Sequence, residues 1–91
     1  MIQRYHLNIE GKVQGVGFRF FTQQQAIEYD LVGWVKNKSN GSVEAEVEGD
    51  EQQIDSFLKS IKTGNRFAKV NQVHQQQLNE LKSEKSFKVI H

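Results

Sequence analysis

The sequence predicts an α+β fold in which two helices cover one face of an antiparallel sheet. Three observations predict it. The first ten residues alternate polar and apolar side chains, Asn40–Gly41 separates two further strand-like segments, and residues 54–61 repeat apolar side chains with a helical period. Strand, hairpin and helix signals therefore occur together in one short chain.

The first strand ends near Gly11–Lys12. Tyr5, Leu7 and Ile9 share one parity of this segment, and the polar side chains between them share the other. Successive side chains of a strand point to opposite faces, so the pattern indicates a strand with one buried face. The stretch GKVQGVGFRFF, residues 11–21, follows it.

Residues 20–30 contain no glycine or proline and suit a helix. The buried side of this helix is ambiguous. Two apolar stripes are available: Phe21, Ala26 and Tyr29, or Phe20, Ile27 and Leu31.

A β-hairpin is expected next. Asn40–Gly41 tolerates positive φ values, and we expect it to form a type I′ turn. Behind the turn, three apolar residues alternate with three glutamates: Val43, Ala45 and Val47 with Glu44, Glu46 and Glu48. The alternation predicts a strand with one buried and one solvent-exposed face, so we interpret the glutamates as solvated rather than as a cation site.

The second helix has the clearest pattern. Asp50 can cap it, and Gln53 occupies the partner position of a capping box. Ile54, Phe57, Leu58 and Ile61 follow with the spacing of one helix face. RFAKVNQVH and SFKVIH then indicate strands, separated by a polar segment.

The element order is therefore β-α-β-β-α-β, with a short extra strand indicated at the end. This order predicts a ferredoxin-like sandwich, as one domain over residues 1–91. If the first strand runs up and the first helix down, the second strand runs up again. Residues 14–19 should then lie close to residues 36–38, and we expect the functional site at that end of the sheet.

Composition narrows the possible functions. A formal net charge of +1 gives no general attraction to nucleic acid or to an anionic membrane. The absence of cysteine excludes disulfides and thiol chemistry. His6, His74 and His91 lack the spacing of a metal site or a catalytic triad. No signal-peptide pattern or membrane-length apolar run is present, so we expect a cytoplasmic protein.

The glycine loop, defined here as residues 14–19, has the features of an anion site. Gly15 and Gly17 allow positive φ, so successive backbone N–H groups can converge on a ligand. The N-terminus of the following helix adds a partial positive charge. Arg19 supplies a planar guanidinium that matches two oxygens of a phosphoryl or carboxylate group.

Two other glycine motifs do not fit. The loop lacks the Gly-Lys-Ser/Thr of a P-loop and the third glycine of a dinucleotide-binding fingerprint. VGFRFF faintly resembles an RNA-recognition strand, whose aromatic side chains stack on bases. Gln14 stands where that motif has a basic residue, and the aromatics enter a helix, so single-stranded RNA binding is a minor alternative.

Together these residues resemble the acylphosphatase family. The resemblance lies in GKVQGVGFR at 11–19, GWVKNKSNGSVE at 33–44 and VEGD at 47–50, and with the element order it covers essentially the whole chain. Separated motifs in the right order are more specific together than any one of them alone. Family members usually carry proline after the second helix, and its absence here concerns loop rigidity rather than the site.

The resemblance implies a monomeric enzyme that hydrolyses acyl phosphates to a carboxylate and inorganic phosphate without a metal or cofactor. Arg19 would bind the phosphoryl oxygens, and Asn37 would position the attacking water. The remaining phosphate contacts would come from the loop backbone: Gln14, Gly15, Val16, Gly17 and Phe18. The expected partner is a small-molecule acyl phosphate, with no nucleic acid and no membrane.

The main alternative is a non-catalytic module that binds an anion or an acyl phosphate within a larger assembly. Similar domains are fused to carbamoyl-transferring maturation enzymes, so carbamoyl phosphate would be a suitable ligand. The presence of both Arg19 and Asn37 favours a free-standing enzyme over such a module.

Overall fold

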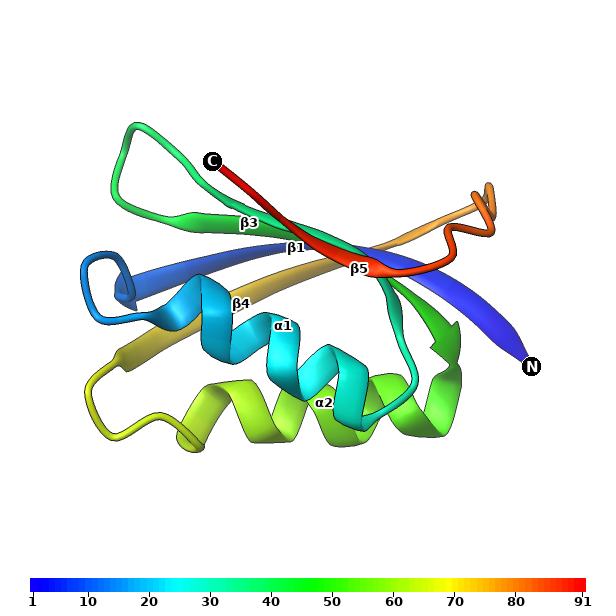
Figure 1. The fold of residues 1–91 in the computed structure, drawn as a ribbon, viewed down its shortest axis with the longest axis horizontal. Helices are drawn as coiled ribbons and strands as arrows, with labels where there is room; N and C mark the ends of the chain where they lie inside the picture. Colours follow the sequence, from blue (N-terminus) through cyan, green and yellow to red (C-terminus); the bar gives the residue numbers. More distant parts are fainter.

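Both helices pack on the same face of a five-stranded sheet in the computed structural model, which describes residues 1–91 (Figure 1). The elements are β1 (Ile2–Lys12), α1 (Phe18–Glu28), β2 (Val32–Asn37), β3 (Val43–Asp50), α2 (Glu51–Thr63), β4 (Lys69–Leu78) and β5 (Phe87–Ile90). The strands lie in the order β4-β1-β3-β2-β5. The predicted ferredoxin-like α+β fold is confirmed, and β5 is the short extra strand. Neither helix is long and apolar enough to cross a membrane.

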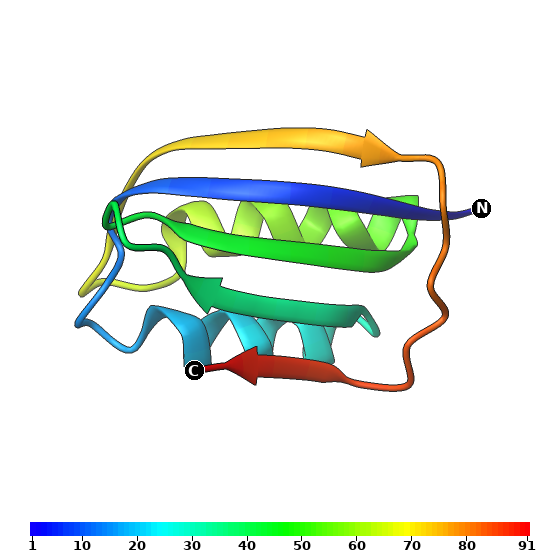
Figure 2. The same ribbon diagram turned by 90° about the horizontal axis from the view of Figure 1, so that it is seen from above.

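The sheet is antiparallel across four strands and mixed at one edge. β1 pairs antiparallel with β3 and β4, and β2 pairs antiparallel with β3. β5 runs parallel to β2, with Val89 opposite Val35. Residues 79–86 carry the chain from the β4 edge to the β2 edge, so β5 enters beside β2 from the same end (Figure 2). The expectation of an antiparallel sheet is corrected for this one pair.

The core lies between the sheet and the two helices. Leu7 and Ile9 of β1 are fully buried, as their alternation predicts. Asp50 caps α2 by accepting a 3.0 Å hydrogen bond from the N–H of Gln52, but the Gln53 side chain makes no reciprocal bond. Full burial of a large apolar side chain contributes about 1.5–3 kcal/mol. The buried apolar residues are Leu7, Ile9, Val13, Phe18, Ala26, Leu31, Val35, Val43, Ala45, Val47, Ile54, Phe57, Leu58, Ile61 and Phe87.

The structure decides which side of α1 is buried. Ala26 faces the core, and Phe21 and Tyr29 pack partly buried beside it. Phe20 and Ile27, from the other stripe, are each 60 % exposed. The helix begins two residues earlier than predicted, directly after the second glycine of the loop.

The β2–β3 hairpin does not have the predicted type I′ turn. Gly41 has a positive φ of 93°, but Asn40 does not. The N–H of Gly41 donates to the oxygen of Lys38, and the N–H of Lys38 donates to the oxygen of Ser42. This pattern is a three-residue loop closed by a glycine bulge. Asn40 Oδ1 stabilises it by accepting from both the N–H and the Oγ of Ser42, at 3.0 and 2.6 Å.

The sheet face opposite the helices carries a buried ion-pair network centred on Arg4. This side chain is 0 % exposed, and its guanidinium lies 2.7 Å from Glu46, 3.0 Å from Glu48 and 2.6 Å from Glu84. Glu84 belongs to the segment 79–86, which lies over this end of the face. The network therefore attaches that segment to β1 and β3.

The expectation of solvated glutamates on β3 is wrong because of these contacts. The side chains of Glu46 and Glu48 are 13 and 6 % exposed. Burial alone would raise the pKa of Glu48, but the N–H groups of Lys82 and Ser83, together with Arg4, more than offset it and lower that pKa. Glu46 and Glu48 therefore both pair with Arg4 and do not face solvent freely.

Candidate active site

The glycine loop forms the turn from β1 into α1. Gly15 and Gly17 have φ values of 76° and 75°, the left-handed conformation that L side chains rarely adopt. A Cβ at either position would meet no atom within 4 Å. The sequence-based expectation of positive φ is confirmed, and the glycines are required by backbone conformation rather than by crowding.

The N-terminus of α1 is uncapped. No side chain makes a capping hydrogen bond there, and the first turn has no acidic residue. By contrast, Asp50 caps α2, and Glu51 lies in its first turn. The first N–H groups of a helix have no intrahelical acceptor and carry partial positive charge. Those of α1 are therefore free to bind an anion held by the glycine loop.

Gln14 joins the glycine loop to the β2–β3 hairpin. Its Nε2 donates hydrogen bonds of 2.7 Å to the oxygen of Lys38 and 2.8 Å to the oxygen of Ser42. The predicted approach of residues 14–19 to residues 36–38 is thus confirmed. The side chain of Gln14 acts here as a structural link, a role that the motif alone does not reveal.

Arg19 lies in the first turn of α1 and is half-buried. Its Nη1 donates a 3.0 Å hydrogen bond to the backbone oxygen of Ile90 in β5. Its remaining guanidinium nitrogens make no hydrogen bond to the protein. One nitrogen is thus used to orient the side chain, and the others are free to bind oxygen atoms of a ligand.

Asn37 is the last residue of β2 and comes just before the hairpin loop. Its Oδ1 is buried and accepts no hydrogen bond. A buried polar atom without a partner costs about 1–3 kcal/mol, so most such atoms in native proteins have one. This oxygen can therefore accept a hydrogen bond from a bound molecule.

These features meet in a cavity of about 360 Å³. Of the predicted site residues, Val16 alone does not line it; the Val16 side chain packs against the core instead. Phe18 is 1 % exposed, so its ring supports the cavity from the core side. The lining residues are Val13, Gln14, Gly15, Gly17, Phe18, Arg19, Phe20, Gln23, Asn37, Val89 and His91.

Five of the lining residues come from positions that the sequence analysis did not assign to the site, and three of these, Gln23, Val89 and His91, lie outside the stretch 11–21. Gln23 lies one turn after Arg19, and its Nε2 donates a 3.0 Å hydrogen bond to the oxygen of Phe87. Val89 and His91 come from the C-terminal end of the chain. The pairing of β5 with β2 brings these residues beside Asn37, and only the strand order could have revealed it.

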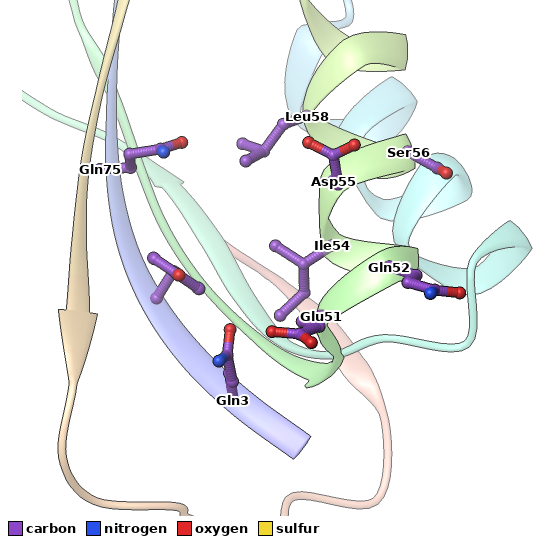
Figure 3. A pocket seen from close by; sticks show the side chains of 9 residues that line it. Gln3, Glu51, Gln52, Ile54, Asp55, Ser56, Leu58 and Gln75 are labelled. Atoms are coloured by element: carbon purple, nitrogen blue, oxygen red, sulfur yellow. The ribbon is translucent and has the colours of Figure 1, made fainter. Parts of the chain in front are cut away.

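A second hollow, of about 470 Å³, lies between α2 and strands β1 and β4 (Figure 3). Ile54 and Leu58 point from α2 toward the strands, and Gln3 and Gln75 face them (Figure 3). The lining includes carboxylates but no cationic side chain: Gln3, Tyr5, Glu51, Gln52, Ile54, Asp55, Ser56, Leu58 and Gln75. This hollow is larger than the cavity at the glycine loop, but it lacks a group that could neutralise a phosphoryl charge.

The geometry also bears on two of the other hypotheses. The aromatic residues of VGFRFF lie in α1 and not on a strand, which removes the geometric basis for reading this stretch as an RNA-recognition strand. No three Asp, Glu or His side chains come together where they could hold a metal ion. The arrangement at the glycine loop has N–H donors, a cation and a free acceptor, which suits a phosphoryl group and a water molecule.

Comparison with known proteins agrees with this chemistry. The sequence profile of the acylphosphatase family matches residues 5–89. An acylphosphatase of Geobacillus thermodenitrificans is 43 % identical over 90 residues, which cover 99 % of this chain and 96 % of the relative. The crystal structure of acylphosphatase from Bacillus subtilis matches with a TM-score of 0.94 and 37 % identity over 100 % of both chains. Full-length HypF, in a phosphate- and nucleotide-bound form, matches with a TM-score of 0.87 and 34 % identity over 100 % of this chain and 12 % of that one. The chain therefore belongs to the acylphosphatase family of enzymes.

Proposed function

We propose that this enzyme hydrolyses acyl phosphates by direct attack of water on a phosphoryl group held by Arg19 and the glycine loop, with Asn37 orienting the water. The observation that carries the proposal is the set of groups that line one cavity. Arg19, the uncapped N-terminal turn of α1 and Asn37, whose buried Oδ1 has no hydrogen-bond partner, all line the same space.

The first role is to bind charge. The transferring phosphoryl group develops negative charge on its oxygens, and donors already in place stabilise that charge without reorganisation. Arg19 is oriented by its bond to Ile90, and the N–H groups of the first turn of α1 point the same way as the helix dipole. Together these groups would hold the phosphoryl oxygens.

The second role is to align water. A water molecule that donates a hydrogen bond to Asn37 Oδ1 would have its own oxygen lone pair free to attack phosphorus. The new bond joins water oxygen to phosphorus, and the bond from phosphorus to the acyl oxygen breaks. The carboxylate leaves with the electron pair and, as a weak base, needs no general acid. Asparagine is a poor base, so the water proton passes to a phosphoryl oxygen of the substrate.

The proposal also covers the oligomeric state, the cofactor requirement and the cellular location. All of the groups named above come from a single chain, which supports a monomer as the active form. No step requires a metal ion or a cofactor. The proposal also places the enzyme in the cytoplasm, an expectation that rests on the sequence alone.

A binding module is the second candidate. The observation in its favour is the match to HypF, where the matched part makes up 12 % of a longer chain. In that case the cavity would retain an acyl phosphate such as carbamoyl phosphate without hydrolysing it. The two candidates share the anion site and differ in whether Asn37 activates water.

Hydrolysis of benzoyl phosphate in the presence of EDTA distinguishes the two candidates. We expect wild-type turnover to persist in EDTA and to be lost in Arg19→Ala. Arg66→Ala is the matched control, because that guanidinium lies over the Phe67 ring and Arg66 does not line the cavity. Saturable binding of inorganic phosphate without turnover would favour the binding module, and turnover that EDTA abolishes would overturn the metal-free mechanism.

A further inference from the structure

The mouth of the active-site cavity has an exposed aromatic side chain. Phe20 is 60 % exposed, although it follows Arg19 directly and lines the same cavity. The half-buried Val89 of β5 lines the same cavity. The deeper lining is different in character, since Asn37 Oδ1 is buried and the first turn of α1 supplies N–H donors.

This division of the cavity corresponds to the two parts of an acyl phosphate. The phosphoryl group fits the polar end, where Arg19 and the glycine loop lie. In-line attack requires the leaving acyl oxygen to lie on the side of phosphorus opposite the water, and hence away from Asn37. The acyl group is then directed to the remaining lining, where Phe20 and Val89 present apolar surface.

We infer that Phe20, together with Val89, forms a contact surface for the acyl group and gives the enzyme a preference for acyl phosphates with an aromatic or bulky apolar acyl group. This inference rests on the proposed function of the same site. Small acyl groups, such as acetyl or carbamoyl, would reach the phosphoryl site equally well but gain little from the rim. An aromatic acyl group would bury the exposed face of Phe20. The interaction between two aromatic rings is more favourable than the buried apolar area alone would give.

The chain offers a close control for this idea. Phe67 is 63 % exposed, nearly the same as Phe20, but it does not line the cavity. Exposed apolar side chains are common on proteins and need no special role. A difference between the two phenylalanines would therefore report the position of Phe20 and not its exposure.

The experiment measures kcat/KM for benzoyl phosphate and acetyl phosphate in wild type, Phe20→Ala, Phe20→Leu and Phe67→Ala. We expect Phe20→Ala to lower kcat/KM for benzoyl phosphate by about two- to tenfold, mainly through KM, and to leave acetyl phosphate within about twofold. Phe20→Leu should recover part of the loss. The competitive inhibition constant of inorganic phosphate should not change, because that ion needs only the polar end.

The outcomes separate the inference from the proposed function. If wild type hydrolyses neither substrate, the proposed function fails and the inference fails with it. If wild type hydrolyses both substrates but Phe20→Ala lowers both equally, or Phe67→Ala has the same effect, the proposed function stands and the acyl contact at Phe20 is overturned.

Discussion

The side-chain amide of Gln14 donates hydrogen bonds of 2.7 Å to the backbone oxygen of Lys38 and 2.8 Å to that of Ser42. Lys38 directly follows Asn37 in the chain. One side chain therefore fixes the glycine loop to the hairpin next to Asn37, the residue proposed to orient water. The distance between the two proposed catalytic regions depends on a donor that need not touch the substrate.

Replacing Gln14 should separate the two regions. Each neutral hydrogen bond contributes about 1 kcal/mol, so Gln14→Ala should lower the free energy of unfolding by about 1–2 kcal/mol and reduce kcat more than it raises KM. Gln14→Glu should be worse near neutral pH, because a carboxylate would face two carbonyl oxygens without a proton to donate. Urea unfolding and steady-state kinetics with benzoyl phosphate test both variants, with the exposed Gln24→Ala as control. Wild-type kinetics in Gln14→Glu would contradict the linking role.

The guanidinium of Arg19 should not be replaceable by another cation. Nη1 donates to the oxygen of Ile90, so in the proposed mechanism the remaining nitrogens hold the phosphoryl oxygens. A lysine offers a point charge that cannot do both. We expect Arg19→Lys to lose activity nearly as completely as Arg19→Ala, with kcat/KM reduced by at least about 10²–10³. The measurement is kcat/KM for benzoyl phosphate in the two variants. Near-normal turnover by Arg19→Lys would contradict the proposed role of the planar guanidinium.

Loss of Asn37 should affect the chemical step. The phosphoryl group would still bind to Arg19 and the glycine loop, but the attacking water would lose its acceptor. We expect Asn37→Ala to lower kcat by roughly 10²–10³ and to change KM little. Asn79→Ala, an exposed site between β4 and β5, serves as control. A change confined to KM would make Asn37 a substrate-binding residue.

The overall fold could be predicted because its signals are local. The parity of β1, the cap at Asp50 and the apolar face of α2 each depend on neighbouring residues in the chain. The edge pairing of β5 with β2 is different, since it depends on how residues 79–86 cross the sheet. Gly33 illustrates a further limit: its Cβ would lie 1.9 Å from the oxygen of Glu46, and nothing beside Gly33 in the sequence signals that approach.

In the candidate site, too, some features could be predicted from the sequence, and others depend on contacts between distant parts of the chain. Arg19 and the two glycines were proposed from residue type and spacing, Asn37 was proposed from the resemblance of its motif to a known family, and the structure brings all four to one cavity. The partner that orients Arg19 is the backbone oxygen of Ile90, and any residue type can supply a backbone oxygen. Arg4 was missed for a related reason: its parity on β1 indicated a solvent-facing position, and its burial comes from a segment about 80 residues away in the chain.

The stability of the fold should depend on pH through Glu48, which accepts hydrogen bonds from the backbone N–H groups of Lys82 and Ser83. Glu48 has a lowered pKa: burial works against the lowering, and the N–H groups of Lys82 and Ser83 and the Arg4 guanidinium outweigh it. A carboxyl whose folded pKa lies below its unfolded value of 4.5 stabilises the protein above that pH. The stabilisation is lost as the pH falls through the folded pKa.

Glu48→Gln isolates this contribution. At about pH 7 we expect the variant to unfold with a free energy about 1.5–3 kcal/mol below wild type, the range for hydrogen bonds to charged groups. At about pH 3 the wild-type carboxyl gains its proton more readily when unfolded, so the gap between the two proteins should narrow. Asp55→Asn removes an exposed pair with Lys59 and should cost less than about 1 kcal/mol at either pH. Urea unfolding at the two pH values measures the gap, and an equal deficit at both would mean that the charge of Glu48 contributes nothing and that its shape alone matters.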